Sequence, residues 1–362
     1  MSEQITKEKY MADKRADINN YENLLKAVLA LKKYFEEEKN AQFYFGGHLI
    51  NSQKKENPNY KGDTPDIIVE TSSKSLLGEA KKSLPDPSTF VSKEQYIKSV
   101  IENKIMAQLK KYDADFENLK IKDHDVFLLV PEHNNDALGI LKFDYLDKDK
   151  HFQNKFFLLV YNIGLLANTK SIMVKLDYGE CSDSLLLDKL KRAIRYNEGD
   201  LAKELAKFKI FEENENSTPV EYILTILWTS IIPEILKAND KEQILERYAK
   251  KENKFTVKLS SLMDYLNKLY TLPTYPKSDI MHHNDRNQFK TKPVKDAMKI
   301  LINVGLAKEL QKENSDVSWE IHHKPLPEKD EMNYFIGKSY ETLNERKEID
   351  ATGIEKLDKF MK

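Results

Sequence analysis

The chain has 362 residues, of which 40% are hydrophobic and 32% are charged, and its formal net charge is -1. This composition is typical of a folded globular protein and excludes a disordered or membrane-embedded chain. The single cysteine, Cys181, excludes intrachain disulfides and a thiolate metal cluster. Because the total charge is close to zero, any surface that binds a polyanion must come from local clusters of lysine.

Neither a secretory signal nor a membrane span is predicted. Residues 1–17 are polar throughout, and no apolar run reaches the ~20 residues that a transmembrane helix needs. The longest candidate, at residues 220–236, is interrupted by Glu221 and Glu234. We therefore expect a cytoplasmic protein with no membrane partner. The length favours two domains, or one domain with a large extension.

The first half of the chain predicts a mixed α/β fold. Hydrophobic periodicity indicates a long amphipathic helix, a bent strand, a hairpin and a second helix. These elements are expected at residues 17–39, 42–50, 66–81 and 93–112. Three β-branched or aromatic runs then predict buried strands at residues 126–130, 156–161 and 172–176. The resulting order α, β, β, β, α, β, followed by further strands, indicates the α/β class.

The hairpin brings three charged residues together. Counting inward from Asp66 and Glu79 places Ile67 opposite Gly78, so the two acids face each other with their Cβ atoms about 5 Å apart. Lys81 projects from the same face as Glu79 because side chains alternate along a strand. The pattern therefore predicts a cluster of two carboxylates and one amine.

Such a pair of carboxylates is expected to hold a divalent cation. Mg²⁺ binds one or two protein carboxylates while keeping waters and substrate phosphate, and Mn²⁺ can substitute for it. With Asp66 and Glu79 as ligands, the metal would stabilise charge on a scissile phosphate and activate a bound water. Lys81 could orient that water or help to deprotonate it. The cluster thus predicts metal-dependent hydrolysis of phosphodiesters.

These residues also carry a family resemblance. Pro65-Asp66, then twelve residues, then Glu79-Ala80-Lys81 resembles the PD-(D/E)xK signature of the restriction-endonuclease-like nuclease superfamily. The predicted αβββαβ order resembles that family's core, a mixed sheet flanked by helices. Gln108 and Tyr112, in the sequence QLKKY, are similar to the Q-x-x-x-Y element of RecB-like exonucleases. The resemblance, over residues 17–160, implies that these two side chains border the site and contact the metal environment or DNA.

Several alternatives remain within this region. In the family that the chain resembles, an acid from the first helix often completes the site, and Glu22 is the best-placed candidate, with residues 36–38 competing. Asp63 could replace Asp66 if the strand begins earlier, and Glu70 would share its face but lies beside the turn. The alternative to a catalytic site is a solvated patch of charges on the hairpin, which would contribute little to stability.

The second half predicts helices followed by a small hairpin. Residues 182–237 have a helical pattern with a polar break at 212–218, and two further helices are expected at 259–270 and 293–304. Together with a hairpin at 306–322, the last helix resembles the recognition helix and wing of a winged-helix domain. Three lysines in that helix would contact DNA phosphates, namely Lys292, Lys295 and Lys299. The alternative is that a winged fold mediates protein contacts and its lysines are solvated.

The sequence as a whole predicts a Mg²⁺-dependent DNA endonuclease of prokaryotic restriction, phage defence or mobile-element processing. We expect a nuclease-like domain, a helical connector, a winged-helix-like DNA-binding domain and a helical tail. Their boundaries are 1–180, 181–239, 240–326 and 327–362. Double-stranded DNA is the expected partner, in a homodimer or a larger defence or transposition complex. A catalytically inactive DNA-binding protein and an RNA-cleaving nuclease are the alternatives.

Overall fold

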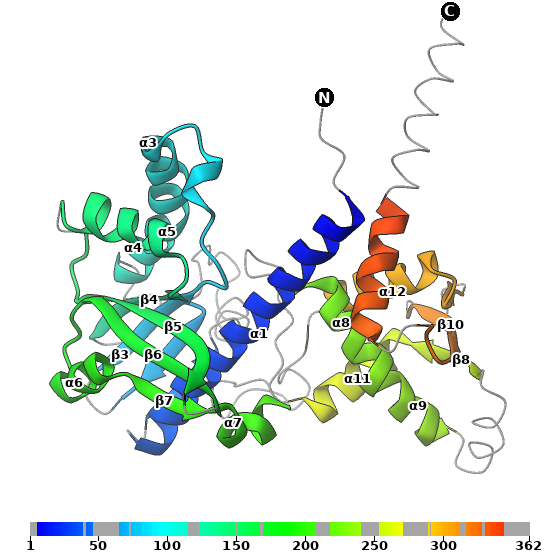
Figure 1. The fold of residues 1–362 in the computed structure, drawn as a ribbon. Helices are drawn as coiled ribbons and strands as arrows, with labels where there is room; N and C mark the ends of the chain where they lie inside the picture. The colour runs from blue at the N-terminus through cyan, green and yellow to red at the C-terminus, as the bar shows by residue number, and fades with distance from the viewer. Residues whose placement is uncertain are drawn as a thin grey trace, which may run out of the picture. The chain divides into compact units, whose positions relative to one another are not determined.

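The structure is a computed structural model of the chain (Figure 1). The residues that it describes are 6–38, 41–45, 65–71, 74–114, 123–148, 151–166, 169–206, 218–239, 253–270, 289, 291–310, 316–327 and 330–343. They form two compact units. The first unit lies within residues 22–209, and the second lies within residues 1–21, 210–270 and 288–362.

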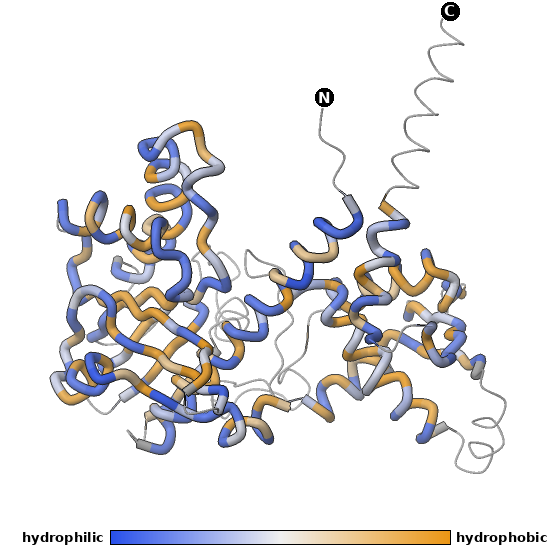
Figure 2. The backbone as a smooth tube through the Cα atoms, viewed as in Figure 1, coloured by the Kyte–Doolittle hydropathy of each residue, from blue (hydrophilic) through white to orange (hydrophobic). Residues whose placement is uncertain are grey.

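A seven-stranded sheet forms the centre of the first unit. Its strands follow the order of the chain, β1 to β7. Their bounds are β1 Gln42–Phe45, β2 Ile67–Glu70, β3 Ser75–Ala80, β4 His124–Pro131, β5 Phe156–Leu166, β6 Thr169–Gly179 and β7 Ile194–Asn197. The β3–β4 and β4–β5 pairs are parallel and the other pairs are antiparallel. The sheet is therefore mixed, and Figure 2 shows that hydrophobic residues dominate its central strands.

One face of this sheet packs against helices that connect its strands. A continuous helical segment between β3 and β4 consists of α3 Lys93–Tyr96, the π-helical η3 Ile97–Met106 and α4 Ala107–Ala114. It begins where the Ser92 side chain accepts a hydrogen bond from the Gln95 amide, an N-terminal cap. A second segment, α5 Asn135–Gly139 and η4 Ile140–Leu146, follows β4. Both segments contribute to the same apolar core.

That core fixes the orientation of α4. Every second residue of the strands, such as Leu77, Leu128 and Leu158, is buried there together with Leu109 and Tyr112 of α4. Burying side chains of this size stabilises the packing by about 1.5 to 3 kcal/mol each. The helix is thereby held over the sheet face on which residues 77, 79 and 81 also project, because side chains alternate along β3.

The long helix α1, Lys7–Glu38, has residues in both units. In the first unit its C-terminal half lies beside α6 Ser184–Arg192, β7 and α7 Glu198–Leu205. The Lys26 ammonium is 2.6 Å from the Glu198 carboxylate, and the Lys189 ammonium lies over the ring of Tyr34 at 5.6 Å from its centroid. The C-terminal half of α1 is thus in contact with both helices that follow β6, α6 and α7.

The second unit contains a three-stranded sheet and several helices. The elements are α8 Val220–Ile226, η5 Leu227–Ile231, α9 Ile232–Asn239, β8 Asn253–Lys258, α11 Leu259–Leu269, α12 Thr291–Asn303, β9 Ala307–Glu309 and β10 Ser318–His323. The sheet order is β8-β10-β9, and both pairs are antiparallel. A final helix, at residues 331–343, contacts the N-terminal half of α1 through Lys7–Glu341 at 3.0 Å and Arg15–Asp330 at 2.9 Å.

The mixed α/β class expected from the sequence is confirmed. The predicted order of elements through β4 is also present, although α1 begins ten residues before the predicted start. Strands β5 and β6 have 11 residues each, longer than expected, and β7 extends the sheet into the segment that was expected to be a helical connector. No helix in the described part of the chain has the length and apolar character needed to span a lipid bilayer.

Candidate active site

The β2–β3 hairpin has the register that the sequence predicts. Ile67 pairs with Gly78 and Glu70 pairs with Ser75. Asp66 lies immediately before β2, and Glu79 is the next residue of β3 after Gly78. The two acids are thus at opposing positions on neighbouring antiparallel strands. Gly78 allows close packing of the sheet here, since a Cβ atom at this position would lie 2.1 Å from the ring of Phe127.

The three predicted charged residues are all buried. Their exposed fractions are 8% for Asp66, 2% for Glu79 and 5% for Lys81. The Lys81 ammonium donates to Oε1 of Glu79 at 2.7 Å, and Oδ2 of Asp66 accepts a hydrogen bond from the Ala80 amide at 2.9 Å. A solvated surface patch would leave such groups exposed, so this alternative is wrong for the three side chains.

Helix α4 adds two side chains to the cluster. Oε1 of Gln108 accepts a hydrogen bond from the Lys81 ammonium at 3.2 Å. The hydroxyl of Tyr112, which is 1% exposed, donates to Oε2 of Glu79 at 2.7 Å. Both oxygens of Glu79 therefore accept a hydrogen bond, one from Lys81 just after β3 and one from Tyr112 on α4. Gln108 and Tyr112 border the cluster, as the resemblance implied.

Tyr161 on β5 supports the end of β3, a contact that the sequence did not predict. Its hydroxyl donates to the backbone carbonyls of Lys81 at 3.3 Å and Lys82 at 3.4 Å. Burial raises the pKa of Tyr161 well above its usual range, so the phenol stays protonated and remains a donor. The Lys81 amide is bonded in turn to the Leu129 carbonyl at 2.8 Å. The backbone that carries Lys81 is thus fixed from two neighbouring strands.

The charges of this cluster suit a divalent cation. Two of its three charged side chains are acids at opposing positions on the hairpin, and two carboxylates this close repel each other unless a cation lies between them. Two carboxylates are also the donor set that Mg²⁺ takes from proteins, since waters and phosphate oxygens complete its shell. The residues present therefore fit Mg²⁺, or Mn²⁺ in its place.

Two other acids of the described part of the chain, Glu22 and Glu70, are not joined to this cluster. Glu22 is half-buried on α1, and among the described residues no hydrogen bond or ion pair links it to Asp66, Glu79 or Lys81. Glu70 lies at the turn end of the hairpin, where Oε2 accepts a hydrogen bond from the Tyr44 hydroxyl at 3.3 Å. Asp63 lies outside the described residues. In the described part of the chain, no three acidic, histidine or cysteine side chains gather as a metal site.

The three lysines predicted to contact DNA lie on α12 in the second unit. Lys292 and Lys299 are exposed and Lys295 is half-buried. Lys299 forms an ion pair with Asp296 at 2.8 Å on the same helix. The apolar side of α12, including Val294, packs into the unit, so these lysines occupy its more solvated side.

Comparisons of the chain with protein-family models, with curated proteins and with solved structures found no match. Hydrogen bonds join Glu79, Lys81, Gln108 and Tyr112, and Asp66 lies opposite Glu79 on the hairpin; these five residues are hereafter the carboxylate cluster.

Proposed function

We propose that the chain is a metal-dependent phosphodiester hydrolase, a nuclease whose active site is the carboxylate cluster. The observation that carries this proposal is the buried convergence of Asp66, Glu79 and Lys81 with Gln108 and Tyr112. Burial of two acids and an amine often destabilises a folded protein, because the free-energy cost of removing the charges from water can exceed their mutual attraction. A catalytic role would explain why such a cluster is present. Buried clusters of charged side chains in this arrangement are concentrated at functional sites.

Asp66 and Glu79 are the proposed ligands of Mg²⁺ or Mn²⁺. When bound, the ion would supply charge stabilisation at a scissile phosphate and a more acidic water. The protein's own groups would do the rest. Lys81 would donate to a phosphate oxygen or orient the attacking water, and Gln108 would hold the Lys81 ammonium.

Tyr112 has a different proposed role from the DNA contact expected from the sequence. Its hydroxyl is buried and donates to Glu79. We assign it to holding Oε2 of the Glu79 carboxylate, while the Lys81 ammonium bonds to Oε1. The direct nucleic-acid contacts would then come from exposed residues.

We also propose that the first unit has a restriction-endonuclease-like core and the second unit a winged helix, which would suit the same function. The order α1, β1, β2, β3, α3–α4, β4 agrees with the core of the restriction-endonuclease-like family that the sequence resembles. In the second unit, the order α8–α9, β8, α11, α12, β9, β10 with the sheet order β8-β10-β9 agrees with a winged helix. In that assignment α12 is the recognition helix, and its lysines would bind DNA phosphates.

A plasmid-nicking assay tests the proposal. Supercoiled plasmid is incubated with the chain in Mg²⁺, Mn²⁺ or EDTA, and parallel reactions use duplex oligonucleotides, single strands and RNA. We expect nicking with either metal and none in EDTA, with duplex DNA as the preferred substrate. Preferred cleavage of RNA would favour the RNA-cleaving alternative. Binding to DNA without any metal-dependent cleavage would favour the catalytically inactive alternative.

A further inference from the structure

The C-terminal end of α4 is attached to the sheet by a second buried polar group. Asp113, the residue after Tyr112, is 6% exposed. Its Oδ2 accepts a hydrogen bond from the Gln153 amide at 2.7 Å, and its Oδ1 accepts one from the Asn154 amide at 2.9 Å. The side-chain amide of Asn154 also donates to Oδ1 at 3.0 Å. One carboxylate thus joins α4 to the segment that enters β5.

His124, the first residue of β4, holds the same end of α4. Its ring is completely buried, and Nε2 lies 3.0 Å from the backbone carbonyl of Tyr112. Because a carbonyl can only accept, Nε2 carries the proton and donates it. Burial lowers the pKa of His124, which keeps the ring neutral near pH 7. We call Asp113, His124 and Asn154 the α4 clamp.

The clamp and the carboxylate cluster meet at one residue. The Tyr112 carbonyl is held by His124, while the Tyr112 hydroxyl donates to Glu79. Gln108 lies one helical turn earlier on α4, on the same side of the helix. The position of α4 therefore determines the hydrogen bond from Tyr112 to Glu79 and the hydrogen bond from Lys81 to Gln108.

We propose that Asp113 is a positioning residue, which through the α4 clamp sets Tyr112 and Gln108 against the carboxylate cluster. This inference rests on the proposed hydrolase function of that cluster. The Asp113 carboxylate bonds to the backbone amides of residues 153 and 154, and no hydrogen bond among the described residues joins it to Glu79. It would therefore act on the reaction only through the placement of α4. Outer groups that orient the residues of a metal site typically change affinity or activity by about 10- to 100-fold when substituted.

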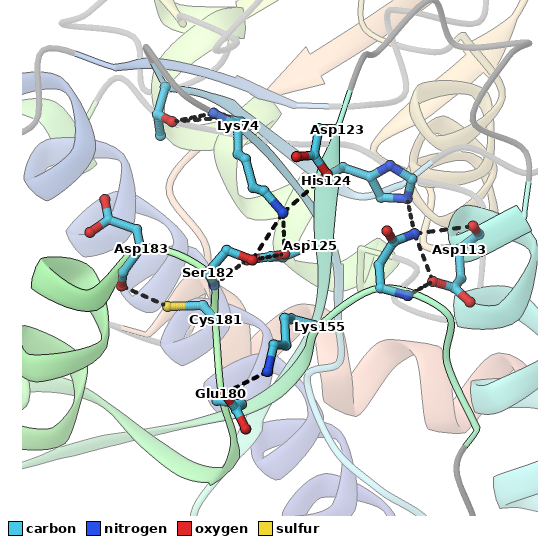
Figure 3. Close-up of polar contacts among 12 residues, drawn as sticks. Lys74, Asp113, Asp123, His124, Asp125, Lys155, Glu180, Cys181, Ser182 and Asp183 are labelled. Atoms are coloured by element: carbon cyan, nitrogen blue, oxygen red, sulfur yellow. Dashed lines mark hydrogen bonds and ion pairs between the residues drawn. The ribbon is translucent and has the colours of Figure 1, made fainter.

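Asp125, which follows His124 on β4, provides the control for Asp113. It is completely buried, accepts a hydrogen bond from the Ser182 amide at 2.6 Å and one from the Ser182 hydroxyl at 2.8 Å. Figure 3 shows Asp113 and Asp125 on either side of the strand that carries His124. Asp125 joins a loop to β4, and Asp113 joins α4 to the segment before β5, but Asp125 has no bond to α4 among the contacts drawn. In Asp113→Asn the new NH₂ group faces N–H donors, whereas in Asp125→Asn it can donate to the Ser182 hydroxyl while the remaining oxygen accepts from the Ser182 amide.

The first test compares the two variants by metal-dependent cleavage. We expect Asp113→Asn to lower kcat by about tenfold or more, whereas Asp125→Asn stays within about twofold, given comparable losses of thermal stability. In a Tyr112→Phe background, Asp113→Asn should lower kcat much less, because residues that act through one another are not additive. Equal effects of the two Asn variants, or a full effect of Asp113→Asn without the Tyr112 hydroxyl, would overturn the proposal.

The second test does not require cleavage. Hydrogen exchange of backbone amides is measured by mass spectrometry on peptides from α4 and from the β2–β3 hairpin. We expect faster exchange in α4 for Asp113→Asn and no change there for Asp125→Asn. Unchanged exchange in α4 for Asp113→Asn would overturn the positioning role. If the unmodified chain cleaved no substrate while α4 still loosened, the hydrolase function would fail and the clamp would stand.

Discussion

Glu79 and Lys81 form an ion pair that is almost fully shielded from solvent, with 2.7 Å between Oε1 and Nζ. They are separated by one residue, since Lys81 directly follows the end of β3, and the alternation of side chains places them on the same face. A buried pair of this kind is weak evidence for stability, because the charges lose their hydration. Its position beside Asp66, Gln108 and Tyr112 is better explained by chemistry than by packing.

Substitution of the acidic ligands or the lysine should abolish cleavage. We expect Asp66→Asn, Glu79→Gln and Lys81→Met each to reduce metal-dependent nicking by about 10²-fold or more, because each removes charge stabilisation at the reacting phosphate. Glu70→Gln is the matched control. Glu70 is an acid on the same hairpin, but among the described residues its carboxylate bonds to Tyr44 and not to the carboxylate cluster. Undiminished nicking by the three variants, or an equal loss with Glu70→Gln, would refute the assignment.

The ion pair also predicts a specific pattern of stability. Lys81→Met leaves the buried Glu79 carboxylate without its ammonium partner, so the free energy of unfolding should fall by about 3 kcal/mol. Adding Glu79→Gln to Lys81→Met should restore part of this loss, since the unpaired charge is then removed. Urea denaturation of the four chains in this cycle measures the coupling. Additive losses would mean that the two side chains do not interact in solution.

Stability should decrease in mild acid because of His124. Its pKa is lowered by burial from the ordinary value of 6.5, so the unfolded chain binds more protons between the two pKa values. The contribution of the neutral ring is therefore complete above pH 6.5 and is lost as the pH falls through the lowered folded pKa. His124→Gln keeps a donor for the Tyr112 carbonyl but does not titrate, so its stability should depend less on pH. If the stability of this variant depended on pH as strongly as that of the unmodified chain, the buried His124 ring would not be the cause of the acid sensitivity.

The lysines of α12 should contribute a salt-sensitive term to DNA binding. We expect Lys292→Glu, Lys295→Glu and Lys299→Glu to weaken binding to all sequences alike, and each to lower the salt slope of log affinity by about 1. Lys237→Glu is the control for Lys299→Glu. Both lysines pair with an acid three residues earlier on a helix of the same unit, Lys237 with Glu234 at 2.7 Å and Lys299 with Asp296 at 2.8 Å. Equal affinity and salt slope in all variants would give α12 another role.

Much of the carboxylate cluster could be predicted from the sequence because its members are close in the chain or periodic. The β2–β3 register follows from a short turn and from apolar residues on both strands, which fix the pairing. That register places Asp66 near Glu79 and aligns Lys81 with it. Gln108 and Tyr112 were predicted only through their resemblance to the Q-x-x-x-Y element, in which the two residues lie one helical turn apart.

The supporting groups could not be predicted because their partners are distant backbone atoms. Tyr161 donates to carbonyls about 80 residues earlier, and Asp113 accepts from amides about 40 residues later. No local pattern marks such contacts. The first ten residues of α1 were missed for a related reason, since Lys7 and Arg15 find their partners in the distant segment 330–343.

Manganese binding to crystals of the chain tests the central claim most directly. Crystals soaked in Mn²⁺ are measured near the manganese absorption edge, for the unmodified chain and for Glu79→Gln. We predict an anomalous peak within coordination distance of the Asp66 and Glu79 carboxylates, about 2.0 to 2.3 Å, and its loss in the variant. A fully occupied manganese elsewhere with none between these two acids would contradict the account.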